Sequence, residues 1–153
     1  SHKTPYFLFS KERLKHNIDE FSHDFADVKV YYAMKANFER QIVEYLDVCG
    51  VGFEVASKYE LEILKQFDVD PKKIIYGTAI KPIDHIESFH EYGVEIYACD
   101  TMEELEKLAK YAPGAKVFIR LHADNHGSSI DLSEKFGTSP ELAVELLLAC
   151  DRQ

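Results

Sequence analysis

The stretch VKVYYAMKANFERQIVEYLDVCGVGFEVA (28–56) decides the fold, because it places two strands on either side of a helix. Residues 28–33 and 51–56 are rich in β-branched and aromatic side chains, which favour strands. Residues 40–49 between them have a helical pattern of apolar residues, and Gly50 is a suitable helix end. Two strands joined by a helix are typical of a parallel βαβ unit.

The same alternation continues along the chain and predicts five βα units. The short repeat fits a (β/α)8 TIM-type barrel better than a doubly wound sheet, and the sequence has neither GxGxxG nor GxxxxGK[ST]. A closed barrel needs eight units and typically about 250 residues. The 153 residues therefore predict a partial α/β barrel. The further predicted strands are 74–77, 94–100 and 116–122, and the further helices are 11–25, 57–67, 82–92, 101–112 and 139–150.

Composition and charge exclude several classes of partner. The formal net charge is −9, so we expect neither nucleic acid nor an anionic membrane as a partner. No apolar run approaches the roughly 20 residues of a transmembrane helix, and we expect no signal peptide. The three cysteines, Cys49, Cys99 and Cys150, are odd in number and lack metal or redox spacing. We therefore expect a cytoplasmic protein with reduced thiols.

Polar residues gather where the predicted parallel strands end, which is where βα barrels place their chemistry. Lys35 follows the apolar run 28–33, so we expect its amine to be partly desolvated and usable as a nucleophile toward an aldehyde. The spacing also fits a structural lysine whose amine reaches solvent. Arg120 lies inside a predicted strand, where we expect a buried ion pair with Glu54 as a candidate partner.

Two further polar groups are interpreted as structural. The three acidic residues within 103–106 lie near Lys107 on a predicted helix, so we expect them to form a solvated face. His122 and His126 flank Asp124, but no third strong ligand follows at a suitable spacing. We therefore expect no metal site.

Six short motifs occur in an order that resembles a known enzyme family. The chain is similar, from about Thr4 to its end, to the N-terminal half-barrel of the pyridoxal phosphate-dependent ornithine/diaminopimelate/arginine decarboxylases, which have an alanine-racemase-like barrel. Within that family it looks most like the ornithine decarboxylases. The motifs are YYAMKAN (31–37), GVGFEVASKYELE (50–62), KIIYGTAIKPIDHI (73–86), GVEIYACDTMEELEKLAK (93–110), AKVFIRLHADN (115–125) and LSEKFG (132–137).

The resemblance implies pyridoxal 5'-phosphate as the cofactor and assigns roles around it. Lys35 corresponds to the lysine that carries the internal aldimine and takes part in proton transfer. Ala33 corresponds to a residue beside the cofactor ring, and Arg120 to one that sets the local electrostatics. Glu60 matches a further carboxylate of the pocket, and Glu54 stands where ornithine decarboxylases usually have Asp.

The resemblance also implies a homodimer, in which Asp100 and Lys135 match positions that form salt bridges to the partner subunit. It implies that residues 1–153 are the N-terminal part of a pyridoxal phosphate-binding (β/α)8 barrel, with the family's C-terminal β-domain absent from them. The family's ring-stacking histidine, its phosphate loop and its pyridine-binding glutamate all lie beyond residue 153. We therefore expect these residues by themselves to be inactive.

The implied activity is decarboxylation of a basic or diamino acid such as ornithine, within polyamine biosynthesis or related amino-acid metabolism. The protonated pyridine ring would accept the electron pair that departing CO2 leaves behind. Two alternatives stay open. One is an amino-acid racemase on the same barrel, although the order of the motifs and LSEKFG weigh against it. The other is a non-catalytic, decarboxylase-like regulatory protein, although the presence of Lys35 favours an enzyme.

Overall fold

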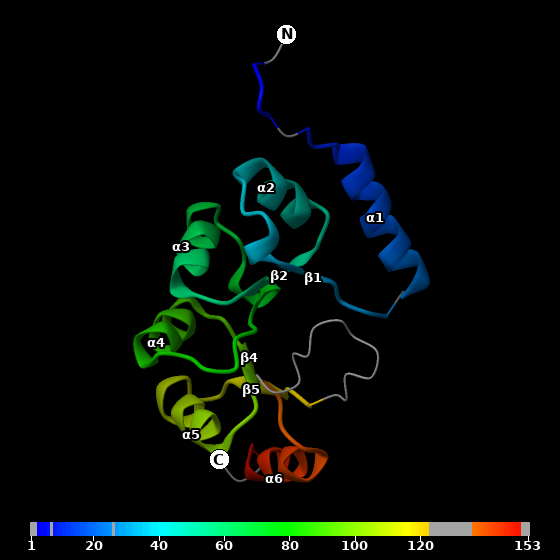
Figure 1. The fold of residues 1–153 in the computed structure, drawn as a ribbon. Helices are drawn as coiled ribbons and strands as arrows, with labels where there is room; N and C mark the ends of the chain where they lie inside the picture. The colour runs from blue at the N-terminus through cyan, green and yellow to red at the C-terminus, as the bar shows by residue number, and fades with distance from the viewer. Residues whose placement is uncertain (1–2, 7, 26, 123–135, 151–153) are drawn as a thin grey trace.

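One parallel sheet organises the chain. A computed structural model describes residues 3–6, 8–25, 27–122 and 136–150 (Figure 1). Its five strands pair in chain order, and every pair is parallel. A doubly wound sheet reverses its strand order at a switch point, whereas a barrel does not. The sequential order therefore confirms the predicted partial barrel. The strands are β1 (Tyr31–Ala33), β2 (Gly52–Val55), β3 (Ile74–Tyr76), β4 (Ile96–Cys99) and β5 (Lys116–Ile119).

The helices lie along one side of this sheet. Figure 1 shows α2 to α5 as an arc around the strands, with α1 beside the β1 edge and α6 beyond β5. Helix α1 buries no residue completely, although Leu14 and Ile18 pack partly against the core. The helices are α1 (Lys11–Asp24), α2 (Arg40–Val48), α3 (Lys58–Gln66), α4 (Ile83–Tyr92), α5 (Met102–Tyr111) and α6 (Pro140–Cys150), and the 3-10 turns are η1 (Met34–Ala36) and η2 (Pro71–Lys73).

Local sequence explains where several helices start. The side chains of Ser10, Ser57 and Thr101 each accept a hydrogen bond from the backbone N–H three residues later, which satisfies a donor that the helix leaves unpaired. Helix α4 starts one residue later than expected, because Pro82 is its cap and not its first turn. It ends at Gly93, whose φ of 100° is a conformation that glycine adopts without strain.

The two faces of the sheet differ in burial. The face toward the helices is closed, and Tyr76 stacks on Phe89 of α4 with ring centroids 3.9 Å apart. The other face carries the row Ala33, Glu54, Ile75 and Ile96, which are paired in register and only half-buried. We call this row and its side of the sheet the open face. The strand residues buried completely on the helix side are Phe53, Val55, Ile74, Tyr76, Tyr97 and Cys99.

The strands are shorter than the sequence predicts. The predicted strand 28–33 pairs as a strand only from Tyr31, and β4 covers 96–99 of the predicted 94–100. After Ala33 the chain turns at once into η1, which contains Lys35. Across the ranges that the structure describes, no helix is long and apolar enough to cross a bilayer.

Candidate functional site

Lys35 lies at the carboxyl end of β1, but its predicted desolvation is wrong. The turn η1 buries Met34 completely and leaves Lys35 exposed. The apolar run therefore ends by burying a methionine, and the lysine behind it reaches solvent. Nearby, Asn37 fixes the start of α2, because its Oδ1 accepts the backbone N–H of Glu39 at 3.0 Å. The result is an accessible primary amine at the end of a buried strand.

Glu54 projects from β2 on the open face and lies across the end of β3. A Cβ built on Gly77 would overlap the Glu54 side chain, with Cδ and Cγ both 2.7 Å away. Gly77 is held against β2 by its N–H, which donates to Val55 O at 3.0 Å. The missing side chain at Gly77 therefore provides the space that the Glu54 carboxylate occupies. Ala33, the neighbour of Glu54 in register on β1, is also small.

Arg120 follows β5 and shares the open face with Glu54, because side chains alternate along a strand and the register aligns the rows. The expected ion pair between them is wrong. Within the described ranges Arg120 is exposed, and its guanidinium lies 4.8 Å from the centroid of the Phe136 ring. Three inter-strand spacings separate β2 from β5, which amounts to about 14 Å. That separation is too long for a direct ion pair.

Glu60 joins the end of β2 to the start of α3. Its Oε2 accepts the backbone N–H of Ala56 at 2.5 Å, and its own N–H donates to Ser57 Oγ at 3.3 Å. The second bond is the cap bond that the sequence Ser57-x-x-Glu60 predicts. The Glu60 carboxylate differs from a standard capping box, because it accepts the N–H of Ala56 and not that of the cap residue Ser57. The half-buried Glu60 carboxylate therefore sits at the carboxyl edge of the sheet, where it orders the chain that leaves β2.

Asp100 lies directly after β4 and is only 7% exposed. Its Oδ2 accepts the backbone N–H of Gly137 at 3.0 Å. Thr138 then pairs with the chain next to β5, since its N–H donates to Arg120 O at 2.9 Å. Asp100 thus links the end of β4 to the segment that returns beside β5. Lys135, its predicted neighbour at a dimer interface, lies outside the described residues.

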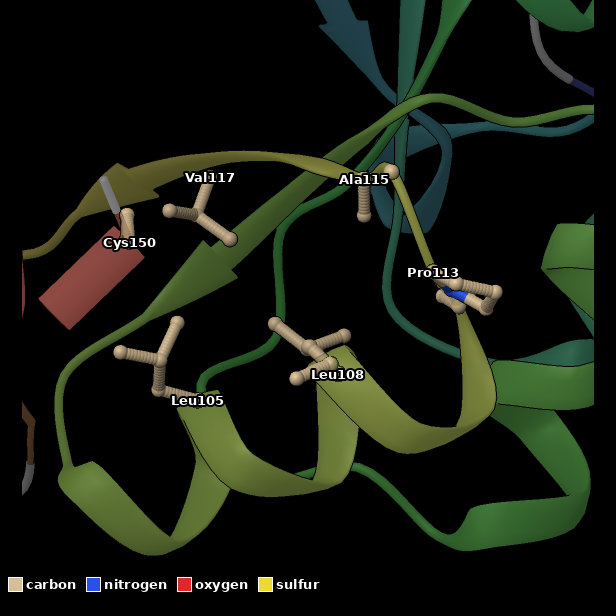
Figure 2. A pocket seen from close by; sticks show the side chains of 9 residues that line it. Leu105, Leu108, Pro113, Ala115, Val117 and Cys150 are labelled. Carbon is tan, nitrogen blue, oxygen red and sulfur yellow. The ribbon is translucent and has the colours of Figure 1, made fainter. Parts of the chain in front are cut away.

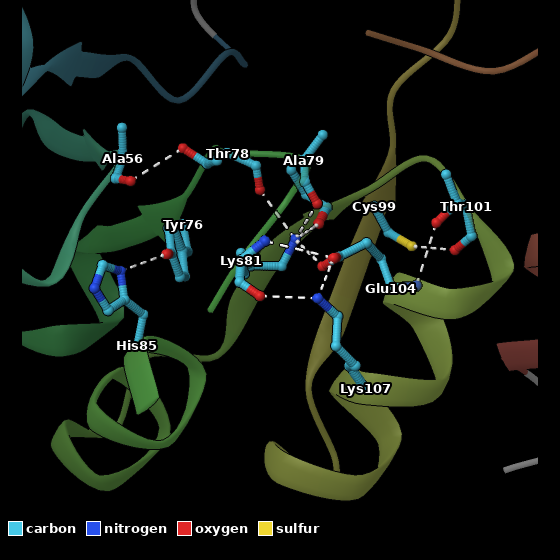
Figure 3. A network of polar contacts seen from close by, with 11 residues as sticks. Ala56, Tyr76, Thr78, Ala79, Lys81, His85, Cys99, Thr101, Glu104 and Lys107 are labelled. Atoms are coloured by element: carbon cyan, nitrogen blue, oxygen red, sulfur yellow. Dashed lines mark hydrogen bonds and ion pairs between the residues drawn. The ribbon is translucent and has the colours of Figure 1, made fainter. Parts of the chain in front are cut away.

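A buried lysine, Lys81, also lies at the carboxyl edge, and its burial was not predicted from the sequence (Figure 3). The Lys81 side chain is completely buried, and its Nζ donates to the carbonyls of Thr78, Ala79 and Ala98 at 2.9, 2.7 and 2.7 Å. The Glu104 carboxylate lies 3.3 Å from the same nitrogen. Burial lowers the pKa of Lys81, and the Glu104 charge opposes that shift.

The predicted solvated face of the 103–106 segment is wrong for Glu104, which is 5% exposed. Its carboxylate lies between the ammonium groups of Lys81 and Lys107. A signal for this was present in the sequence. Glu104 stands three residues after the cap Thr101 and four before Leu108, which is buried. Residues four apart share a helix face, so position 104 faces the sheet together with Leu108.

Other features in the described part of the chain do not form a site. A cavity of about 230 Å³ between α5, β5 and α6 is lined by Leu105, Leu108 and Val117 among other apolar side chains (Figure 2). It lacks the charged groups that the carboxyl edge offers. No group of three or more His, Cys, Asp or Glu in the described ranges could hold a metal ion. Cys49 and Cys99 are free thiols, and burial raises the pKa of Cys99.

Comparison with known proteins shows the family of the chain. Residues 11–153 match the family model described as "Pyridoxal-dependent decarboxylase, pyridoxal binding domain". The chain is 34% identical over 146 residues, 95% of its length, to the lysine/ornithine decarboxylase of Selenomonas ruminantium. It is 37% identical over 120 residues, 78% of its length, to antizyme inhibitor 2 of Xenopus laevis. The arginine decarboxylase of Paramecium bursaria Chlorella virus, solved with agmatine, superposes on 92% of the chain with a TM-score of 0.86 and 28% identity.

These relatives are much longer than the chain. The 153 residues cover 37% of the bacterial decarboxylase, 26% of the antizyme inhibitor and 39% of the viral enzyme. The match extends over both the sequence and the fold of the chain. By sequence and by fold, this chain belongs to the pyridoxal-dependent decarboxylases, whose cofactor is pyridoxal phosphate, and it matches their pyridoxal binding domain from residue 11 onward.

Proposed function

We propose that the native polypeptide carrying this sequence catalyses the pyridoxal phosphate-dependent decarboxylation of a basic or diamino acid, with Lys35 as its catalytic residue. The observation that carries the proposal is the exposed amine of Lys35 at the carboxyl end of β1, in a chain of this family. The substrate class follows the relatives named lysine/ornithine decarboxylase and arginine decarboxylase. Residues 1–153 then form the N-terminal part of the cofactor-binding barrel.

The residues at the open face fit a flat, anionic aldehyde. Lys35 offers a primary amine, the group that condenses with an aldehyde. Ala33 and Gly77 leave room above the sheet, and Glu54 already occupies part of the space at Gly77. Arg120 supplies a permanent positive charge on the same face. These five positions, with Glu60 behind the end of β2, would hold the cofactor.

The chemistry divides between the cofactor and the protein. When bound, pyridoxal phosphate supplies an electron sink for the pair left by departing CO2. Lys35 would hold the cofactor through Nζ, and the same atom could accept or donate a proton near the bound substrate. Arg120 orients the negatively charged groups that bind in the site. Glu60 fixes the end of β2 and thereby the position of Glu54.

The assembly and setting are also part of the proposal. Asp100 and Lys135 contribute to a homodimer interface, and the protein acts on a small amino acid in the cytoplasm. Asp100 supports this role because it holds the segment that contains Gly137, two residues after Lys135. The 153 residues by themselves release no CO2, because the chain accounts for only 37% of the bacterial relative.

Cofactor trapping tests the role of Lys35. The native polypeptide is incubated with pyridoxal phosphate, reduced with borohydride, digested and analysed by mass spectrometry. We expect the reduced adduct on Lys35 and CO2 release from one of ornithine, lysine or arginine. Lys35→Arg abolishes both, whereas Lys29→Arg, two residues before the start of β1, changes neither. An adduct that forms equally in the Lys35→Arg protein contradicts the proposal.

The likeness to antizyme inhibitor 2 favours a second candidate function, a regulatory protein that binds another protein without catalysing a reaction. The two candidates differ in a simple readout. A regulatory protein releases no CO2 from any of the three amino acids, whether or not pyridoxal phosphate reacts with Lys35. Adduct formation together with CO2 release therefore selects the enzyme.

A further inference from the structure

We infer that Lys81 is a positioning residue, whose buried ammonium holds the loop after β3 against β4 and thereby sets the places of Gly77 and Glu54 at the cofactor site. The inference rests on the proposed function, because it concerns the same site. It assigns to Lys81 no contact with substrate or cofactor. Its effect passes through the backbone that the ammonium binds.

All three N–H groups of the Lys81 ammonium donate hydrogen bonds. A lysine has three N–H donors, and all three have carbonyl acceptors within 2.9 Å, from Thr78, Ala79 and Ala98. Two of these carbonyls belong to the loop after β3, and the third belongs to β4. Hydrogen bonds to a charged donor are about twice as strong as neutral ones. One side chain thus fixes the loop to the neighbouring strand.

The other side of the same loop is fixed to β2. Thr78 Oγ1 donates to Ala56 O at 3.2 Å, and the N–H of Gly77 donates to Val55 O at 3.0 Å. Gly77 therefore lies between two anchors, with β2 on one side and the Lys81 contact to Thr78 on the other. Glu54 lies over Gly77, so a shift of this loop moves the backbone on which the Glu54 carboxylate lies.

The Glu104 carboxylate compensates the buried positive charge of Lys81. Its Oε2 is buried and forms no hydrogen bond among the described residues, so the nearby ammonium provides its charge compensation. Its other oxygen is paired with Lys107, which is 30% exposed. Removing Lys81 alone leaves three carbonyls without their donor and a buried carboxylate with one cation fewer, which destabilises the fold. Removing both charges avoids the second penalty.

Lys73 provides a matched control. It stands directly before β3, at the amino edge of the sheet, and its Nζ lies 2.6 Å from Asp47 Oδ1 and 3.1 Å from Asp47 O. It is thus a partly buried lysine with an acidic partner and a carbonyl acceptor, like Lys81. It lies at the opposite end of the same strand from Gly77. A change there affects stability without reaching the cofactor site.

The experiment measures two quantities on the native polypeptide, the dissociation constant for pyridoxal phosphate from its visible absorbance and the urea midpoint of the cofactor-free protein. Lys81→Met raises the dissociation constant about tenfold and lowers the midpoint. Lys81→Met/Glu104→Leu recovers much of the midpoint but keeps the tenfold weaker binding. Lys73→Met lowers the midpoint and leaves the dissociation constant within about twofold. Thr78→Val, which changes no charge, raises the dissociation constant about threefold with little change in midpoint.

The outcomes separate positioning from stability. If binding recovers together with the midpoint in the double variant, or if Lys73→Met weakens binding as much as Lys81→Met, then Lys81 only stabilises the fold. If Lys81→Met does not fold, the double variant and Thr78→Val decide, and unchanged binding in either overturns the inference. An unmodified protein that binds no pyridoxal phosphate overturns the proposed function as well. Normal binding by the unmodified protein and by every variant overturns the inference alone.

Discussion

Gly77→Ala tests the close approach of Glu54 to β3. The new Cβ would lie 2.7 Å from Cδ and Cγ of Glu54, whereas carbon atoms in ordinary contact stay about 3.5 Å or more apart. The Glu54 side chain must therefore move by close to 1 Å, and an off-rotamer side chain costs about 0.5–1.5 kcal/mol. Against this, alanine restricts the unfolded chain and contributes about 0.4–1 kcal/mol of stability where the backbone permits it.

The two terms nearly cancel in the single variant, so its own stability change is small. In a Glu54→Ala background the clash is absent and only the favourable term remains. We therefore expect Gly77→Ala to stabilise the Glu54→Ala protein by about 0.4–1 kcal/mol. The double-mutant cycle should give a coupling of about 1 kcal/mol between the two positions.

Urea denaturation of the four proteins, followed by circular dichroism, measures this coupling. The binding of pyridoxal phosphate provides a second readout, because a displaced Glu54 should weaken it in the Gly77→Ala protein. Equal effects of Gly77→Ala in both backgrounds would show that Glu54 does not lie over Gly77. That result would also remove the main link in the inference about Lys81.

Three other predictions concern the fold. Phe89→Ala should lower the free energy of unfolding by about 3–5 kcal/mol in urea denaturation, because it empties a fully buried site and removes the stack on Tyr76. Burial raises the pKa of Tyr76 and of Tyr97, so an alkaline absorbance titration should show tyrosines that stay protonated until the protein unfolds. The hydrogen bond from Lys116 lowers the pKa of Glu95, so its contribution to stability is present above pH about 4.5 and lost as the pH falls below it. In the Glu95→Gln protein, the urea midpoint should therefore decrease less as the pH is lowered through that range.

The fold was predictable because its signals are local and repeated. Each unit gives an apolar strand and a helix with one apolar face, and Ser57 and Thr101 cap their helices as the sequence indicates. The absence of a phosphate-loop motif and the short repeat then selected a barrel over a doubly wound sheet. Strand ends were less predictable, since pairing at the edge of a sheet depends on neighbours. Residues 28–30 have strand composition but lie before the paired part of β1.

The site was predictable in its location and less so in its contacts. Parallel strands bring their carboxyl ends to one edge, so Lys35, Glu54 and Arg120 could be assigned to it from the sequence alone. The environment of each side chain depends on turns that the pattern does not encode, and η1 exposes Lys35 for that reason. The roles of the predicted site residues stay predictions until the variants are measured.

The open face explains why the sequence suggested a more buried lysine than the structure contains. Ile75 and Ile96 lie in register with Glu54, and both remain half-buried on a side of the sheet that α2 to α5 do not cover. In a closed barrel, inward-pointing branched side chains of this kind fill the interior in layers. The apolar composition of the strands therefore reflects burial on both faces, while the described residues provide only one covering layer. Lys35 is exposed because the open face has no such second layer among the described residues.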